Sequence, residues 1–210
     1  MSHVRSDDFK INSERDEKPV VRMQPFERDD VDLIRRTLRA KKDHRQLALF
    51  NLGIDSMLRG GDLVRMKVSS VRSATGDFKD VIRTRQGKTG NPVENFLAPW
   101  TIESLKQLIL AEDKWQMDYL FTRVGESHGK HLTEVSLRRF VKEWAAIAHR
   151  DPADFSSHSI RRTKPSIIYA ETKDIETCRQ LLGHTSVSAT SAYLNIGSAK
   201  VEAVARRFEI

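Results

Sequence analysis

Apolar residues recur at helical spacing along most of the chain, and acidic or hydroxyl residues stand where helices would begin. The first such pattern follows Asp29 or Asp30, and a second, more apolar one predicts a largely buried helix. Further amphipathic patterns begin at Thr101, Thr133, Asp174 and Thr185. The first predicted helix carries Val31, Ile34 and Leu38. The other predicted helical segments cover residues 47–57, 62–66 (a short turn), 101–109, 133–147, the stretch from His158, 174–182, 185–193 and 199–208.

A different periodicity appears between residues 81 and 98. Residues 81–86 alternate as a strand does, Gly87–Asn91 supplies turn residues, and 93–98 alternates again. Residues 119–121 add a short buried strand or turn. The sequence therefore predicts a mainly α fold with a small antiparallel β-sheet.

The 210 residues fit one large domain. Residues 1–24 mix Ser, Asp, Arg, Lys and Glu with little periodicity and predict a flexible N-terminal arm. We place the domain at 25–197 and a C-terminal helix at 198–210.

Charge and cysteine content narrow the class of protein. With 36 Lys and Arg against 29 Asp and Glu, the net charge is +7, and a pI near 9.6 favours a polyanionic partner over a merely solubilising surface. The single cysteine, Cys178, excludes an internal disulfide framework and a multi-cysteine zinc site. No apolar span reaches 18 residues. We therefore expect a soluble protein of the reducing cytoplasm with no membrane segment.

Several cationic residues and one tyrosine stand in informative contexts. Arg59 directly follows an apolar run, and Lys88 lies in the predicted turn. His158 and Arg161 have the spacing that puts both side chains on one helical face. Breaking a phosphodiester without hydrolysis needs an oxygen nucleophile, cations for the non-bridging oxygens and an acid for the leaving oxygen. The candidates for these roles are Arg59, Lys88, His158, Arg161, His184 and Tyr193.

Rival chemistries lack their motifs. Gly87-Lys88-Thr89 has no upstream glycine of a phosphate loop, and no nucleophile elbow or carboxylate cluster for two-metal chemistry occurs. His158 and His184 have no carboxylate or cysteine at metal-site spacing, so we expect no metal. Tyr119 and Tyr169 lie in apolar or helical contexts that indicate packing.

The order Arg59, Lys88, His158, Arg161, His184, Tyr193 resembles the catalytic domain of the tyrosine recombinases, the phage integrase family. The resemblance implies that Tyr193 attacks DNA to form a 3′-phosphotyrosine, with two arginines as phosphate clamps and Lys88 as the acid. It also implies that Asp62 supports Arg59, and that no cofactor is needed. We add a set of predicted DNA contacts: Arg83, Arg85, Arg138, Arg139 and Arg162.

The family works as a tetramer on two duplexes, so the resemblance implies a homo-tetramer on DNA, with residues 198–210 exchanged between protomers. Most relatives carry an N-terminal core-binding domain that the first 30 residues cannot form. An accessory DNA-bending or directionality factor can take its place. Two alternatives stay open: a non-catalytic DNA-binding protein of the same fold, and a type IB topoisomerase-like relaxing enzyme.

Overall fold

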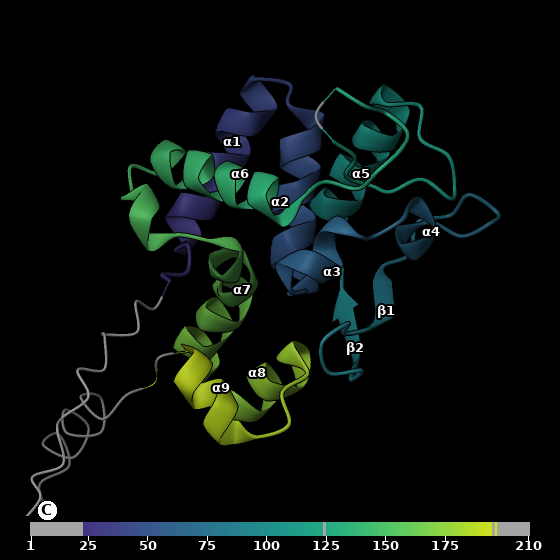
Figure 1. Ribbon diagram of the computed structural model, residues 1–210. Helices are drawn as coiled ribbons and strands as arrows, with labels where there is room; N and C mark the ends of the chain where they lie inside the picture. The colour runs from purple at the N-terminus through teal and green to yellow at the C-terminus, as the bar shows by residue number, and fades with distance from the viewer. Residues whose placement is uncertain (1–22, 124, 195, 197–210) are drawn as a thin grey trace, which may run out of the picture.

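Helix α2 (His44–Ser56) is the centre of the fold (Figure 1). The computed structural model describes residues 23–123, 125–194 and 196. Every residue from Leu47 to Ser56 is buried, as expected of a helix that is apolar around most of its circumference. Helices α1 (Arg28–Ala40), α5 (Pro99–Ala111) and α7 (Ser157–Thr172) pack against it. The predicted buried helix is therefore confirmed.

Aromatic rings join the outer elements to α2. Phe50 of α2 meets Trp144 of α6 (Glu134–Ile147) edge-on, with ring centroids 5.0 Å apart. Phe26, ahead of α1, stacks on Phe155 at 4.7 Å. These rings are almost fully buried, so their packing holds α6 and the segment before α1 against the same hydrophobic core as α2.

The sheet is a single hairpin of β1 (Val81–Arg85) and β2 (Pro92–Phe96). The strands are antiparallel, with Val81 opposite Phe96 and Arg85 opposite Pro92. Two short helices, α3 (Gly60–Val64) and α4 (Val68–Val71), connect α2 to this hairpin. The predicted antiparallel sheet is confirmed, whereas Tyr119 makes only an isolated bridge to Lys67.

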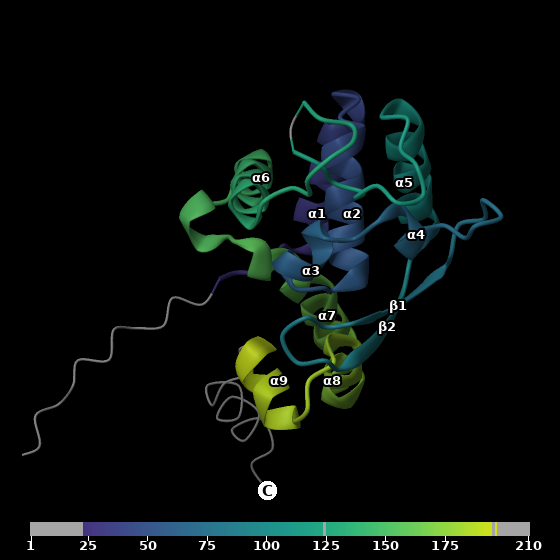
Figure 2. The same ribbon diagram turned by 45° about the vertical axis from the view of Figure 1, so that its right-hand side comes forward.

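The described part of the chain ends in two short helices, of which the first lies beside the hairpin and the second packs on the first and on α7 (Figures 1 and 2). After the 3-10 turn Pro152–Asp154 and helix α7, helix α8 (Ile175–Leu182) begins at Asp174, whose carboxylate accepts the backbone N–H of Thr177. Gly183 ends α8 with φ +63°, and α9 (Val187–Leu194) follows. The helical predictions for this region are confirmed.

Four predicted helix starts were wrong by one to three residues. Helix α5 begins at Pro99 rather than at Thr101. Helix α1 is capped by Glu27, not by Asp29 or Asp30, because Asp30 sits in the first turn and accepts the Glu27 N–H at 2.9 Å. Ser186, not Thr185, caps α9 by accepting the N–H of Ala189. Helix α3 begins at Gly60 rather than Asp62. Neighbouring residues in these segments can all cap a helix, so the sequence alone does not fix the residue at which each helix begins.

The two predicted terminal segments lie largely outside the described residues. All of 198–210 does, and so do residues 1–22 of the predicted arm. Met23 and Gln24 are described, and both bond to the domain. Within the described part of the chain, no helix is long and apolar enough to cross a membrane.

Candidate active site

The structure brings five of the six predicted residues together from four parts of the chain. Arg59 precedes α3, His158 and Arg161 lie on the first turns of α7, His184 follows α8 and Tyr193 ends α9. Arg59 acts electrostatically on each of the other four, so they share one positive region.

Arg161 is a buried cation without a carboxylate partner among the described residues. Only 2% of it is exposed, and its pKa is lowered, first by burial. One guanidinium nitrogen donates to the Leu182 carbonyl at 2.8 Å. The Nη1 atoms of both Arg161 and Arg59 are buried and have no hydrogen-bond partner within the described part of the molecule. Two planar cations with unused donors form a ready site for an anion.

The hairpin that carries Lys88 is docked on the turn before His184. Buried Gln86 donates to the Leu182 carbonyl at 2.8 Å, and Asn91 donates to the Gly183 carbonyl at 3.2 Å. A Cβ at Gly183 would lie 2.4 Å from Gln86 Nε2, so only glycine allows this approach. The sequence did not predict these roles of Gln86 and Asn91. The one feature that could have indicated them is a polar side chain next to the end of a predicted strand.

The Asp62 carboxylate contacts the tip of the hairpin and does not pair with Arg59. Its Oδ1 accepts the backbone N–H of Gly87 at 3.2 Å, and a Cβ at Gly87 would clash with that oxygen at 2.7 Å. The described residues contain no ion pair between Asp62 and Arg59, so the structure gives Asp62 a different contact from the expected one. The exposed Lys88 lies next to Gly87 and lines a cavity of about 420 Å³ with Arg59 and His158.

His184 is a neutral imidazole with a defined tautomer. Its Nδ1 lies 3.1 Å from Thr190 Oγ1, and that hydroxyl donates onward to the Ser186 carbonyl. The imidazole must therefore donate from Nδ1, which leaves Nε2 as a proton acceptor. Burial, then Arg161 and Arg59, lowers the pKa of His184 to about 4. The same causes, with Arg162 added, lower the pKa of His158.

Tyr193 presents a buried, neutral phenol to these groups. Its ring stands perpendicular to His184 (88°), with centroids 5.2 Å apart. Burial raises the pKa of Tyr193 to about 12, and Arg161, Arg162 and Arg59 oppose that rise. The hydroxyl oxygen is buried and, like the two arginine nitrogens, lacks a hydrogen-bond partner in the described structure.

The predicted DNA contacts divide into exposed and buried residues. Arg83 pairs with Glu94 at 2.8 Å, Arg85 donates to the Gly90 carbonyl, and Arg138 is exposed on α6 beside Arg139, which pairs with Glu143. Arg162 differs from these, because only 7% of it is exposed and it donates to the Met23 carbonyl at 2.6 Å. Its burial removes it from the surface on which we expected a phosphate contact.

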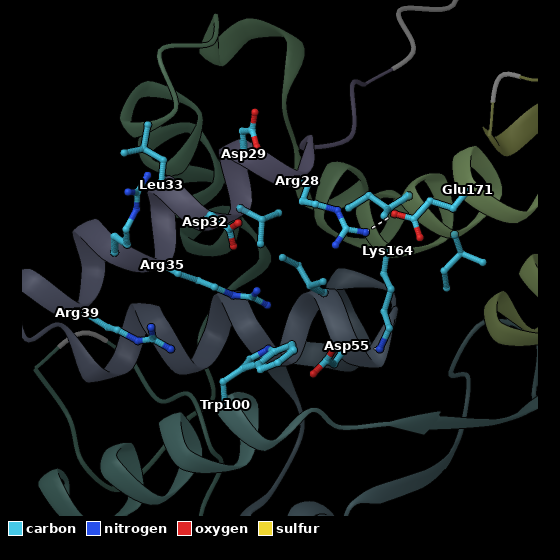
Figure 3. A pocket seen from close by; sticks show the side chains of 15 residues that line it. Arg28, Asp29, Asp32, Leu33, Arg35, Arg39, Asp55, Trp100, Lys164 and Glu171 are labelled. Carbon is cyan, nitrogen blue, oxygen red and sulfur yellow. Dashed lines mark hydrogen bonds and ion pairs between the residues drawn. The ribbon is translucent and has the colours of Figure 1, made fainter.

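A second basic hollow lies away from these residues, between α1, α2, α7 and the start of α5 (Figure 3). It measures about 990 Å³, and none of the six predicted site residues lines it. Arg28 pairs there with Glu171, Lys164 pairs with Asp55 at 2.9 Å, and Arg35 lies over the Trp100 ring at 5.2 Å. We call this hollow the α1 groove.

Comparison with known proteins agrees with this geometry. Residues 25–199 match the model of the phage integrase family. The chain belongs to this family of tyrosine recombinases. It is 30% identical over 157 residues to a probable integrase/recombinase, YoeC of Bacillus subtilis, covering 74% of this chain and 80% of that protein. It is 29% identical to the putative integrase/recombinase y4qK of Sinorhizobium fredii, of which it spans 47%.

Solved structures show the same fold. The XerA recombinase superposes with a TM-score of 0.68 at 20% identity, over 89% of this chain and 65% of that one. The XerH recombinase bound to its difH substrate gives 0.66 at 18% identity, over 89% and 55%. The fold is therefore that of a tyrosine recombinase catalytic domain, as the sequence predicted.

No group of three or more His, Cys, Asp or Glu side chains in the described residues is arranged to hold a metal ion. The positive charge of the site comes instead from arginine side chains. Guanidinium groups stay charged at all relevant pH values, so they can stabilise an anion without a bound cation.

Proposed function

We propose that this protein is a site-specific DNA recombinase that breaks and rejoins DNA through a 3′-phosphotyrosine at Tyr193. One observation carries the proposal: the Tyr193 hydroxyl and the Nη1 atoms of Arg59 and Arg161 are buried without hydrogen-bond partners in the described part of the protein. Buried polar atoms are normally bonded, and atoms left unbonded indicate a missing ligand. A phosphodiester would supply acceptors to the two arginines and an electrophile to the phenol.

In the proposed step, the Tyr193 oxygen attacks phosphorus while the bond from phosphorus to the 5′-oxygen breaks. Arg59 and Arg161 bind the non-bridging oxygens, whose negative charge grows in the transition state. The phenol proton moves toward Nε2 of His184, which is unprotonated at neutral pH. The Lys88 ammonium gives its proton to the leaving 5′-oxygen, and His158 hydrogen-bonds the phosphate.

Rejoining is the reverse of this step. A 5′-hydroxyl gives its proton to the neutral Lys88 amine and attacks the phosphotyrosine, the bond from phosphorus to Tyr193 breaks, and the phenol takes its proton back from His184. The phosphoester bond is exchanged at each step, so the reaction needs neither a nucleotide cofactor nor an added energy source. The products differ from the substrates only in which strand ends are joined.

The partner in this proposal is double-stranded DNA in the bacterial cytoplasm. Crystal structures of XerH with difH and of a lambda integrase dimer with a core site show DNA complexes of proteins with this fold. We propose Arg83, Arg85, Arg138 and Arg139 as further phosphate contacts, and a homo-tetramer on DNA in which 198–210 passes to a neighbour. An accessory factor would assist binding.

Changing Tyr193→Phe tests the proposal directly. Duplexes captured covalently by the parent protein from a random pool would define the target, which is then rebuilt as a nicked suicide substrate. We expect the parent to form an adduct that survives denaturing electrophoresis, and the variant to form none while binding the duplex equally well. Tyr119→Phe and Tyr169→Phe are matched controls that should keep the adduct. An adduct in Tyr193→Phe, or none with the parent, would overturn the proposal.

A further inference from the structure

Arg162 is a second buried arginine beside Tyr193, and the reaction as proposed does not use it. Its guanidinium carbon lies 5.4 Å from the centroid of the Tyr193 ring, compared with 6.0 Å for Arg161. Neighbouring residues on a helix point about 100° apart. The ring therefore contacts two cations that reach it from different sides of α7.

The two arginines have different second contacts. Arg161 donates to the Leu182 carbonyl at the end of α8, on the phosphate side of the site. Arg162 donates to the carbonyl of Met23 at 2.6 Å, in the segment that leads into α1. A guanidinium can stack on a ring and donate in its own plane at the same time, so Arg162 can bridge the segment and the nucleophile.

The segment beyond Met23 is fixed to the domain by other bonds. The Gln24 N–H donates to the Asp154 carbonyl at 2.9 Å, and the Phe26 N–H donates to Thr163 Oγ1 at 3.1 Å. Thr163 is the residue after Arg162 on α7, so the same turn of the helix holds both the segment and the ring. Met23 lies at the outer end of this anchored stretch, where the chain from residues 1–22 enters.

We propose that Arg162 is a positioning residue that holds the Tyr193 ring for attack and, through the Met23 carbonyl, makes strand cleavage depend on the chain entering the domain. The inference rests on the proposed function. A displacement of Met23 would move the guanidinium, and the ring beneath it would lose its alignment with phosphorus. Movement of Met23 would then change the cleavage rate without any change in the groups that contact phosphate.

The positioning role predicts a change in rate without a change in affinity. Arg162→Met keeps the length of the side chain but removes the guanidinium. Misplacing a nucleophile by about 1 Å costs roughly 10²-fold, so we expect cleavage at saturating duplex to slow by about that factor. Affinity, measured in the Tyr193→Phe background where no cleavage occurs, should not change, because Arg162 does not contact phosphate.

Charge and shape can be separated by a second variant. Arg162→Lys keeps a cation over the ring, so it should recover a large part of the lost rate. Arg162 also opposes the rise in the Tyr193 pKa. Below the pKa of the phenol, a further rise lowers its ionised fraction equally at every pH, so Arg162→Met should cleave more slowly than Arg162→Lys across the whole pH range in which the duplex is stable. A merely structural arginine would move the melting temperature and give Arg162→Met and Arg162→Lys the same cleavage rate.

The link to the entering chain is tested by Gln24→Pro in the full chain. Proline removes the N–H that donates to Asp154 and constrains Met23, but touches neither Arg162 nor Tyr193. We expect slower cleavage in the parent background and no further loss in Arg162→Met, because coupled residues are not additive. Arg28→Met, an exposed arginine of the α1 groove, is the control and should cleave like the parent.

Each outcome decides a separate point. Parent-like cleavage by Arg162→Met overturns the positioning role, and additive losses with Gln24→Pro overturn the link to Met23. If Arg162→Met does not fold, Arg162→Gln, which also removes the charge, takes its place in both the rate comparison and the double variant with Gln24→Pro. A parent protein that forms no adduct overturns the proposed function itself, whereas an adduct that is present and unaffected by these changes overturns only the present inference.

Discussion

The active-site cavity and the α1 groove are both concave and rich in arginine, yet they differ in how their polar atoms are satisfied. The groove is the larger, at about 990 Å³ against about 420 Å³. Its cations face carboxylates: Arg28 faces Glu171, and Lys164 faces Asp55. Arg35 donates to Asn51 at 2.8 Å and is covered by Trp100.

The candidate active site, of which Arg59, Lys88 and His158 line the cavity, shows a different pattern. Of the side-chain atoms in the described structure that are buried without a bonding partner, three belong to Arg59, Arg161 and Tyr193, and none belongs to a residue of the groove. Volume and positive charge therefore do not distinguish a reactive site from a structural one. The clustering of unused hydrogen-bonding capacity does, because several unpartnered donors that face one another are what a bound ligand would complete.

The strongest way to break this comparison is to exchange one arginine in each place for lysine. Arg161→Lys keeps the charge but removes the planar fork, so cleavage should fall by about 10²–10³-fold, the usual cost of losing one transition-state donor. Arg35→Lys should leave cleavage unchanged and destabilise the fold by about 1 kcal/mol through its lost bond to Asn51. Single-turnover adduct formation and thermal unfolding measure the two effects. Equal losses of cleavage would contradict the distinction.

Lys88 is exposed and lines the cavity. Its substitution tests whether it takes part in the reaction. Lys88→Ala removes the acid and should slow cleavage by about 10²-fold or more. A duplex with a sulfur in place of the 5′-oxygen needs no proton to leave, so it should restore the rate in this variant. Absence of rescue would remove Lys88 from the acid role. Lys79→Ala, an exposed lysine ahead of β1, is the matched control.

Protonation of His184 should be visible in stability. The pKa of His184 is lowered to about 4 in the folded protein, against about 6.5 in an unfolded chain. Between these values the unfolded chain binds more protons, so the free energy of unfolding rises with pH over that window. The melting temperature of the parent should therefore climb from pH 4 to 6.5 more steeply than that of His184→Gln. If the melting temperatures of the parent and of His184→Gln rose with pH in parallel, the His184 imidazole would have an ordinary pKa and would lie in solvent.

The smallest expected effect is that of chelation. Arginines carry the positive charge of the cavity, so adduct formation should proceed at the same rate in excess EDTA. A parallel reaction with added Mg²⁺ is the control. Loss of the adduct in EDTA and its return with Mg²⁺ would contradict the assignment of transition-state stabilisation to Arg59 and Arg161.

Local patterns in the sequence were enough for the helices and the hairpin, whereas the resemblance to the family grouped the six candidate residues. Helical spacing depends on neighbours three and four positions away, and the turn at Gly87–Asn91 depends on its own composition. The resemblance to the family then selected Tyr193 over Tyr119 and Tyr169. Each of these inferences uses only residues close in the chain or an ordered set of motifs.

The contacts that were missed join distant residues. Gln86 bonds Leu182 across 96 positions, and Arg162 bonds Met23 across 139. No periodicity records such pairs, which is why Arg162 was expected on the surface and the Asp62 carboxylate was expected to pair with Arg59 rather than to accept from Gly87. The α1 groove was missed for the same reason, because its walls come from four separate helices.

The carbonyl of Leu182 accepts from both Gln86 and Arg161, each at 2.8 Å. Both lone pairs of one main-chain oxygen are thus used, one by the hairpin and one by Arg161. A substitution at Gly183 would therefore disturb both, because a Cβ there would overlap Gln86 Nε2 and separate the hairpin from the turn that also carries the acceptor of Arg161.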